Sequence, residues 1–508
     1  MAASASLGPY KAKATTSCSQ TLVSLSCDRI SATSAPHKPK CNVVFSANVL
    51  VPLTISSVCV SFNSADQFTS PVVHESENQV LRLNPSAAKA RSLSVEKVLP
   101  PFKLYEPRDA DPDWGSLRRE AVALAVKVAR RCGYPPSRRQ LLANRRRHAV
   151  ALARTLKNLL RNSARFRRGD HGFVPLFYIW TMTNRCNFDC TYCSNHRGDA
   201  YPNLWRSGRR RDLSTRQGMR LIDVMRKSSA IYFCGGEPTM RRDLPVLLEH
   251  AARRNAFNMI NTNGSLIGDL LLKPGWERFL LLMDVVIVSL DALDVDLLAR
   301  TYKVKTSLAR KVLRNLMALR VLQHYVPFKL VANTVVTRET VDEAKAIVDF
   351  CADLGLIFSP VSANVDDHPD EALLADPSYQ SFVNLVLERA RAGQPMIASA
   401  GMLERLLRAT GFQCMPVVFD HVDHDGRLFW PCKASKNSVL VDVLGHPDVE
   451  SVHRAAARLV DPAWFHGSGP GKCGGNCAWM QNCVTDVYGR ALPAPFSSGI
   501  FREIVGLL

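Results

Sequence analysis

The sequence predicts an α/β fold, an open and partial (βα)6 barrel of the TIM type with parallel strands. From Phe173 onward, six short apolar runs alternate with longer stretches of helical periodicity. This alternation is typical of parallel strands joined by right-handed crossovers, with the chemistry at the carboxyl ends of the strands. The predicted strands are 173–182, 229–234, 257–262, 284–290, 328–336 and 355–361.

The first 65 residues are predicted to be a disordered transit peptide. They are rich in Ser, Ala, Thr and Val and contain a single acidic residue, Asp28. Few arginines among many serines favour a chloroplast address over a mitochondrial one, which is more often an Arg-rich amphipathic helix. The alternatives are a mitochondrial protein, or a cytoplasmic protein whose extension has no targeting role.

Residues 41–65 carry no charge, so a membrane span has to be considered. Asn42, Asn48 and Pro52 interrupt the segment, and a spanning helix needs about 20 mostly apolar residues. We therefore expect no membrane span.

Residues 66–112 are predicted to be a linker because prolines recur in a stretch of mixed polarity. Residues 113–170 are predicted to be a basic helical segment. Residues 115–170 contain 16 Lys or Arg against only Glu120 and Asp170, so this segment contributes much of the net charge of +20.

A basic amphipathic helix is predicted over 138–168, with an apolar stripe that packs on the following domain. The stripe consists of Leu142, Val150, Leu152, Leu156, Leu159 and Leu160. A solvated basic face is the simplest interpretation of the arginines between them. RNA, an anionic membrane or an acidic partner are the alternatives.

The core, 171–365, places polar or glycine-containing residues after its predicted strands. Cys186 follows the first strand and Gly235 the second. The third, fourth and sixth strands lead into the segments 261–264, 289–291 and 360–364. Because the carboxyl ends of parallel strands share one edge of a sheet, these residues are expected to form one site.

Three cysteines, Cys186, Cys190 and Cys193, form a C-x3-C-x2-C pattern after the first strand. Zinc prefers four ligands, and only His196 offers a fourth nearby. A ferredoxin-type cluster would also need a fourth cysteine close by. The remaining possibility is a four-iron cluster with three cysteine ligands and one open iron.

These residues resemble the radical S-adenosylmethionine (AdoMet, SAM) superfamily. The match consists of the cysteine pattern with Tyr192 before its last cysteine, and of Gly235-Gly236-Glu237-Pro238, which has the form of the family's GGEP motif. The resemblance implies a 4Fe-4S cluster whose open iron binds AdoMet. An electron from a donor such as ferredoxin or flavodoxin then cleaves AdoMet, and the resulting 5'-deoxyadenosyl radical abstracts a hydrogen atom from substrate.

The glycines of this motif are expected to let the backbone approach the methionine moiety, and Glu237 to offer a carboxylate to its ammonium group. Other predicted cofactor-binding residues are Asn261, Asn263, Ser289 and Asp291. A common turn or a helix cap would explain these four residues equally well.

Residues 366–412 are predicted to be a helical connection, followed by a Gly-, Pro- and Cys-rich section of little periodicity over 413–490 and a tail over 491–508. This section resembles the SPASM or twitch auxiliary-cluster region of radical AdoMet enzymes. Its spacing departs from the SPASM pattern, and Val487 stands where a cysteine is expected. We expect one auxiliary 4Fe-4S cluster, held by Cys473, Cys477, Cys483 and either Cys414 or Cys432, with zinc as the alternative.

The other residues of interest fit simpler roles. Asp420, Asp423, His424 and Asp425 are explained as well by an exposed polar turn as by acid–base chemistry. Cys132, Cys234 and Cys351 are expected to be buried packing residues.

The sequence therefore predicts a radical AdoMet enzyme that abstracts a hydrogen atom from its substrate, with a peptide or an acidic protein as the first expectation for that substrate. The alternatives are RNA or a small molecule as substrate, or a non-catalytic metal-binding scaffold.

Overall fold

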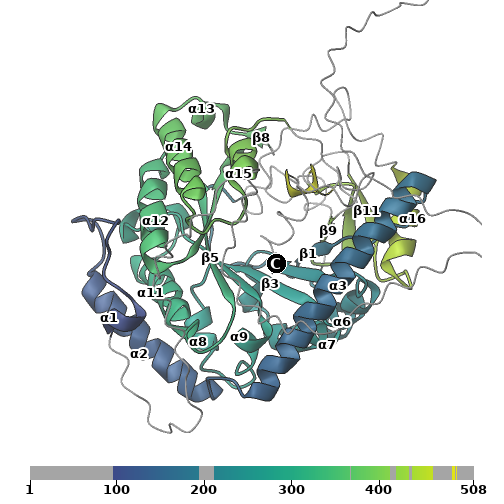
Figure 1. Cartoon of the computed structure of the whole chain (residues 1–508), viewed down its shortest axis with the longest axis horizontal. Helices are drawn as coiled ribbons and strands as arrows, with labels where there is room; N and C mark the ends of the chain where they lie inside the picture. Colours follow the sequence, from purple (N-terminus) through teal and green to yellow (C-terminus); the bar gives the residue numbers. More distant parts are fainter. Residues whose placement is uncertain are drawn as a thin grey trace, which may run out of the picture. The chain divides into compact units, whose positions relative to one another are not determined.

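The computed structural model describes residues 95–193, 211–365, 368–411, 419–433, 438–460, 483–486 and 488 (Figure 1). The predicted transit peptide, the uncharged segment 41–65 and His196 lie outside these residues. Among the described helices, none has both the length and the apolar character needed to cross a bilayer.

The sheet has nine strands in the order β11-β10-β9-β1-β2-β3-β4-β5-β6. Its parallel part confirms the predicted α/β class, and the strands differ from the predicted runs by a few residues at their ends. These strands are β1 (Phe177–Thr181), β2 (Ala230–Cys234), β3 (Phe257–Thr262), β4 (Val285–Ser289), β5 (Lys329–Val336) and β6 (Ile357–Ser362). The sheet is open, as expected of a partial barrel, because β11 and β6 are its two edges.

Helices connect successive strands of this parallel part, and their sequences explain where they begin. Ser214 caps the helix that leads to β2 through a capping box with Gln217, and Asp294 caps the helix after β4. The connecting helices are α6 (Thr215–Val224), η1 (Pro238–Met240), α7 (Leu244–Arg253), α8 (Ile267–Leu270), α9 (Phe279–Leu282), α10 (Val295–Tyr302), α11 (Thr306–Leu322) and α12 (Val341–Leu354).

The core lies between this helical layer and the sheet. All of β4 except its last residue is buried, and α11 buries ten of its residues, including Val312 and Leu316. A β-branched strand that is buried on both faces is typical of a parallel sheet covered by helices. The rigid framework therefore extends to the strand ends, where the polar residues lie.

Part of the predicted linker is packed, contrary to expectation. Tyr105 is buried, and its backbone N–H donates to Asp353 Oδ2 at 2.8 Å. Its ring packs edge-on against Phe350 of α12 and Trp114, the first residue of α2 (Trp114–Cys132). Before it lies α1 (Val95–Val98). The prolines that suggested a linker belong to an extended strap held by aromatic side chains.

The helix α3 (Arg138–Arg168) has the predicted bounds, but of the predicted apolar stripe only Leu159 is buried, whereas Leu142, Leu152 and Leu160 are exposed. The prediction that the whole stripe packs on the barrel is therefore wrong. Its inward face is polar and donates hydrogen bonds to carbonyl oxygens of residues that precede the strands. Asn162 donates to Val174 O before β1, Asn158 to Lys227 O before β2, and Asn144 to Leu281 O before β4. Carbonyl groups at strand starts need donors, and the asparagines of α3 supply them.

One charged pair reinforces this contact. Arg147, on the same face of α3, donates to Ala256 O before β3 and forms a bidentate pair with Asp284, whose Oδ1 lies 2.6 Å from Nη2. Both side chains are buried. The helix therefore closes the amino ends of β1 to β4 through polar groups (Figure 1).

The section predicted to lack periodicity extends the sheet. β9 (Phe419–Val422) pairs in parallel with β1, and β10 (Arg427–Trp430) and β11 (Val439–Asp442) continue it antiparallel. Four-residue strands are too short to show a period in the sequence. The helix α16 (Val449–Leu459) packs here, and its His453 pairs with Asp420 at 3.0 Å.

The region predicted to be a helical connection contains α13 (Glu371–Leu374), α14 (Pro377–Arg391) and α15 (Ala400–Leu407). Two short strands, β7 (Asn364–Val365) and β8 (His368–Pro369), precede them.

Candidate functional site

The cysteine loop, residues 182–193, begins as a continuation of the sheet. Met182 N–H donates to Cys234 O at 2.8 Å, Gly236 N–H donates to Thr183 O at 2.8 Å, and Glu237 N–H donates to Arg185 O at 2.8 Å. The ladder between β1 and β2 thus extends beyond both strands. It fixes the position of Cys186 relative to the GGEP segment.

The two glycines of the GGEP segment are required by this contact. A Cβ at Gly235 would lie 2.5 Å from Thr183 O, and one at Gly236 would lie 2.3 Å from Arg185 O. Gly235 also has a φ of 153°, which side chains rarely adopt. The close approach of two backbone segments therefore requires glycine at both positions, in addition to the expected approach to a cofactor.

The three thiols of the cysteine loop lie close enough to affect one another's titration. Burial raises the pKa of Cys186 to about 11 and raises that of Cys190 further, and the neighbouring cysteines add to both shifts. Cys193 follows in a tight turn, its N–H donating to Cys190 O at 3.1 Å. Because metals bind thiolates, occupation of this site must release protons.

The far side of the cysteine loop rests on α10. Asp189 N–H donates to Tyr302 O at 3.2 Å, and Thr191 N–H donates to Thr301 O at 3.0 Å. Phe188 is buried against the ring of Tyr302, with ring centroids 5.1 Å apart. Backbone bonds and an aromatic contact thus hold the loop between α10 and β2.

Two predicted cofactor-binding residues, Tyr192 and Asp291, bind each other. The Tyr192 hydroxyl donates to Asp291 Oδ2 at 2.5 Å, and Val335 N–H donates to Asp291 Oδ1 at 2.8 Å. Burial raises the pKa of Asp291 to about 6. In this structure Asp291 connects the cysteine loop to the ends of β4 and β5. Ser289, also predicted to bind the cofactor, is half-buried at the end of β4.

Glu237 is fully buried and is surrounded by neutral donors. Its Oε1 accepts hydrogen bonds from Thr239 N–H at 3.0 Å, Thr239 Oγ1 at 2.6 Å and Thr262 Oγ1 at 2.8 Å, and its Oε2 accepts one from Asn263 N–H at 2.7 Å. Burial raises the pKa of Glu237. No cation among the described residues pairs with it. It also caps η1, whose first residue is the predicted site residue Pro238.

The predicted residue Asn263 braces the cysteine loop from β3. Its side-chain amide donates to Asn187 Oδ1 at 2.9 Å, and its Oδ1 accepts from Ser265 Oγ at 2.7 Å. Asn187 in turn donates to Ser265 Oγ at 3.0 Å. Asn261, one pleat earlier, has a buried Oδ1 that lacks a hydrogen-bond partner among the described residues. That oxygen remains available to a polar ligand.

Sequence reasoning missed Asn184 and misread the turn after β9. Asp423 and His424 are buried there, as is Asp420 before them, so the expectation of an exposed turn is wrong for these three residues. The Asn184 amide lies 3.1 Å from a ring nitrogen of His424, and the buried Oδ1 of Asn184 has no partner in the described part of the chain. The turn therefore reaches the start of the cysteine loop.

Charged groups interact within this turn. Burial disfavours the charged imidazole of His424, but the Asp423 carboxylate 3.0 Å away outweighs this effect and raises the pKa of His424. Asp425 lies close enough that ligand atoms of all three residues fall within 4.8 Å. The signal in the sequence was only the run of acidic residues and histidine in a section with no recognisable period.

Of the second cysteine group, only two members belong to the described residues. Cys432, after β10, and Cys483 are both buried. Cys414, Cys473 and Cys477 lie outside the described residues, so the structure does not test the predicted auxiliary ligand set. Cys351 is buried as expected, whereas Cys132 and Cys234 are half-buried.

Comparison with known proteins identifies one matching family. Residues 180–351 match the family model described as the radical SAM superfamily. A similar relative is the Fe-coproporphyrin III synthase of Methanosarcina barkeri, which is 41% identical over 92 residues, 18% of this chain and 21% of the relative. The PqqA peptide cyclase of Granulibacter bethesdensis is 32% identical over 101 residues, 20% of this chain and 25% of that protein.

The alignments thus span about a fifth to a quarter of the length of these relatives. Among solved structures, that of Streptococcus suis SuiB bound to S-adenosylmethionine is similar, with a TM-score of 0.44 and 16% identity. The match covers 58% of this chain and 69% of SuiB.

Proposed function

Because the chain belongs to the radical SAM superfamily through residues 180–351, we propose that it reductively cleaves AdoMet and abstracts a hydrogen atom from a substrate. The single observation that carries this proposal is the geometry of the cysteine loop, which contacts from the segments after β2 and β3 and from α10 hold so that its three thiols lie close enough to affect one another's titration. A donor such as ferredoxin or flavodoxin would supply the electron.

The residues present fit a 4Fe-4S cluster with AdoMet. Cys186, Cys190 and Cys193 would hold three irons, and the unpartnered oxygens of Asn184 and Asn261 would accept hydrogen bonds from the cofactor. When bound, the cluster supplies the electron that splits the sulfonium of AdoMet into methionine and a 5'-deoxyadenosyl fragment.

Glu237 would attract the ammonium group of AdoMet through its uncompensated charge. A carboxylate has about four lone-pair positions, and Oε2 uses only one of its two for the protein. Oε2 therefore keeps a lone pair to accept a hydrogen bond from the ammonium group, and the buried location would strengthen the attraction.

Anaerobic reconstitution tests this function. With dithionite and AdoMet, the loaded protein should form 5'-deoxyadenosine, which chromatography with mass spectrometry measures. Replacing Cys186, Cys190 and Cys193 by Ala should remove about four irons per chain and abolish the product. The matched control is Cys132→Ala, which changes a half-buried thiol on α2 and should retain both. A fully loaded protein that forms no product would favour the scaffold alternative.

For the substrate, we propose a peptide or protein. The name of one relative, a PqqA peptide cyclase, supports this class, while that of the Fe-coproporphyrin III synthase supports a small molecule. An extract that stimulates AdoMet cleavage can separate the classes. Loss of stimulation after protease digestion would support a peptide, loss after nuclease digestion would indicate RNA, and resistance to both would indicate a small molecule.

We further propose one auxiliary 4Fe-4S cluster, supported by the burial of Cys432 and Cys483. Changing Cys473, Cys477 and Cys483 to Ala should lower iron by about four atoms per chain while AdoMet cleavage partly persists. Loss of zinc instead of iron would identify the alternative site, and an unchanged metal content would exclude both.

The transit peptide is likewise a proposal, supported by the composition of residues 1–65. A fluorescent protein fused to these residues should enter chloroplasts, and a fusion that stays in the cytosol or enters mitochondria would contradict it.

A further inference from the structure

The outward side of α3 exposes large hydrophobic side chains among its cations, which is unusual for a surface helix. Among the described residues, seven large hydrophobic side chains are exposed, and four of them, Leu142, Leu152, Leu160 and Phe166, belong to α3. Leu142 is 62% exposed. These residues extend over about 36 Å of helix at 1.5 Å per residue.

This face exists because the opposite one is occupied. Asn144, Arg147, Asn158 and Asn162 share the face that binds the strand starts, as described above. Leu142 and Leu160 are 18 residues apart, five turns of a 3.6-residue helix, so they share one side, opposite the asparagines, and Leu152 and Phe166 lie to one flank of it. The helix thus turns its polar side chains toward the strand starts and exposes most of its large apolar ones, although Leu159 is buried.

Cations lie around the exposed stripe, which consists of Leu142, Leu152, Leu160 and Phe166. No acidic residue lies on the helix. Of its eleven Lys and Arg residues, eight are exposed, namely Arg138, Arg139, Arg145, Arg146, Lys157, Arg161, Arg167 and Arg168. Apolar side chains between cations, on a helix of this length, are typical of a helix that lies in the surface of an anionic bilayer.

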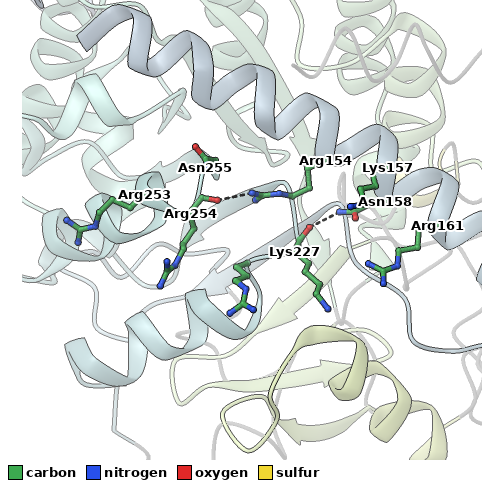
Figure 2. Close-up of a pocket in the computed structure, with 9 residues that line it drawn as sticks. Arg154, Lys157, Asn158, Arg161, Lys227, Arg253, Arg254 and Asn255 are labelled. Carbon is green, nitrogen blue, oxygen red and sulfur yellow. Dashed lines mark hydrogen bonds between the residues drawn. The ribbon is translucent and has the colours of Figure 1, made fainter. Parts of the chain in front are cut away.

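A cationic pocket borders the same helix (Figure 2). It has a volume of about 430 Å³, and its lining contains seven Lys or Arg and no acidic residue, from α3, from the turn before β2 and from the end of α7. Arg154 and Asn158 are held there by backbone carbonyls, as Figure 2 shows. Arg161, Lys227, Arg253 and Arg254 pair with carboxylates outside the lining. Lys157 and Arg226 form no ion pair with any described carboxylate, so their charges are available to phosphate groups.

We propose that α3 and this pocket form a membrane-docking face that binds anionic phospholipid bilayers. The stripe would enter the boundary between headgroups and acyl chains, and the flanking cations would bind lipid phosphates. The site at the carboxyl ends of the strands would then lie at the end of the sheet opposite the membrane.

Other occupants fit the surface less well. A second copy of the chain would bring two sets of exposed cations together. RNA would use the cations, but its backbone gives no reason to expose leucines along the helix. An acidic protein would need an apolar face of its own that matches a straight stripe, whereas a bilayer offers such a boundary everywhere.

Vesicle co-sedimentation of the full-length protein tests the proposal. With phosphatidylcholine vesicles containing about 30% phosphatidylglycerol, we expect binding that weakens as salt rises, and little binding to pure phosphatidylcholine. The variant Leu142→Glu/Leu152→Glu/Leu160→Glu should bind at least about tenfold more weakly, because it places charge in the stripe. The control Leu104→Glu/Leu459→Glu changes exposed leucines elsewhere and should bind as the parent does.

A second variant separates charge from hydrophobic insertion. Arg145→Gln/Arg146→Gln/Lys157→Gln should also lower vesicle binding about tenfold and reduce its salt dependence. Circular dichroism should show parental folding for all variants, since each altered side chain is exposed. Cleavage of AdoMet without vesicles should be unchanged, so this test is independent of the proposed catalytic function.

Three results would overturn the proposal. They are equal binding to neutral and anionic vesicles, full binding by the triple-Glu variant, and no vesicle binding by a protein that binds a labelled single-stranded RNA. In the last case, RNA binding that is lost in the triple-Gln variant and retained in the triple-Glu variant would assign the surface to nucleic acid. Vesicle binding that is lost only on deletion of residues 1–94 would place the docking determinant outside α3.

Discussion

Each end of the parallel sheet contains a buried carboxylate, and the two carboxylates differ in whether a basic side chain pairs with them. At the amino ends, Asp284 is paired with the guanidinium of Arg147, contacts the imidazole Nε2 of His148 and also accepts from Asn258 N–H at 2.6 Å. At the carboxyl ends, Glu237 accepts four hydrogen bonds, all from uncharged donors. The first charge is neutralised within the protein, whereas the second is oriented but left uncompensated.

This difference separates a stabilising contact from a functional one. A buried ion pair fixes α3 to the sheet and is costly to break from one side. A buried carboxylate without a cation costs stability and is retained where a positively charged ligand completes it. We therefore expect changes at the amino ends to alter folding, and changes at the carboxyl ends to alter ligand binding.

The largest effect should come from breaking the amino-end pair. Arg147→Met should lower the free energy of unfolding by about 3–5 kcal/mol, because it removes the guanidinium from the buried Asp284 and leaves only the imidazole of His148 beside it. Urea denaturation of the apoprotein measures this change. The double variant Arg147→Met/Asp284→Asn should recover part of the loss, and cleavage of AdoMet at low temperature should persist. A folded Arg147→Met variant that no longer cleaves AdoMet would contradict the assignment of the amino ends to folding and the carboxyl ends to ligand binding.

At the carboxyl ends, Gly236→Ala should displace the cysteine loop. The added Cβ would meet Arg185 O, a backbone atom that cannot turn away, at a cost of about 3 kcal/mol. We expect a folded barrel with reduced iron content and reduced 5'-deoxyadenosine formation.

Its matched control is Gly401→Ala in α15, where the new methyl group meets nothing within 4 Å. That change should be neutral or stabilising by up to about 1 kcal/mol. Normal iron loading in Gly236→Ala would show that the contact between the two backbones is dispensable.

The free energy of unfolding of the apoprotein should depend on pH through Asp291. The pKa of Asp291 is about 6 in the folded state, above its ordinary value of 3.8, because the group is buried. Between these values the folded state binds more protons than the unfolded state, so stability is fully present below about pH 4 and is lost as pH rises to about 6. The loss amounts to roughly 3 kcal/mol at most.

Asp291→Asn should abolish this decline while it retains acceptor and donor atoms for Val335 and Tyr192. Urea denaturation at a series of pH values measures the slope. An unchanged slope in the variant would assign the decline to another group.

The smallest effect is expected for Tyr192→Phe. Loss of the hydroxyl that donates to Asp291 should cost about 1–2 kcal/mol, measured by thermal or urea unfolding. The same donation lowers the pKa of Asp291, so its removal should move the decline in stability to higher pH. A variant with parental stability and parental pH dependence would show that this bond does not hold the cysteine loop.

Much of the fold was predictable because the parallel strands are largely apolar and β4 is buried on both faces. The run Val285-Val286-Ile287-Val288 is apolar throughout and stands out in any window, and the cysteine spacing needed no structure to be recognised. The loop prediction placed Tyr192, Asn263 and Asp291 at one end of the sheet, and they do lie there, although Tyr192 binds Asp291 and Asn263 binds Asn187.

The remainder could not be predicted, for identifiable physical reasons. Periodicity located α3 but not the direction of its faces, because a polar side chain that donates to a strand carbonyl looks in sequence like one that faces water. The strands β9 to β11 are too short to carry a period, and their position beside β1 is set by contacts between segments more than 200 residues apart. His424 was for that reason assigned to a turn, with no sign of its contact with Asn184.

The extension of the β1–β2 ladder into the cysteine loop has a practical meaning. Peptide hydrogen bonds hold the path of the chain around Cys186. Protein stripped of iron should therefore keep the backbone of the cysteine loop in place. Repeated removal and refilling of iron should then restore the iron content without any refolding of the barrel.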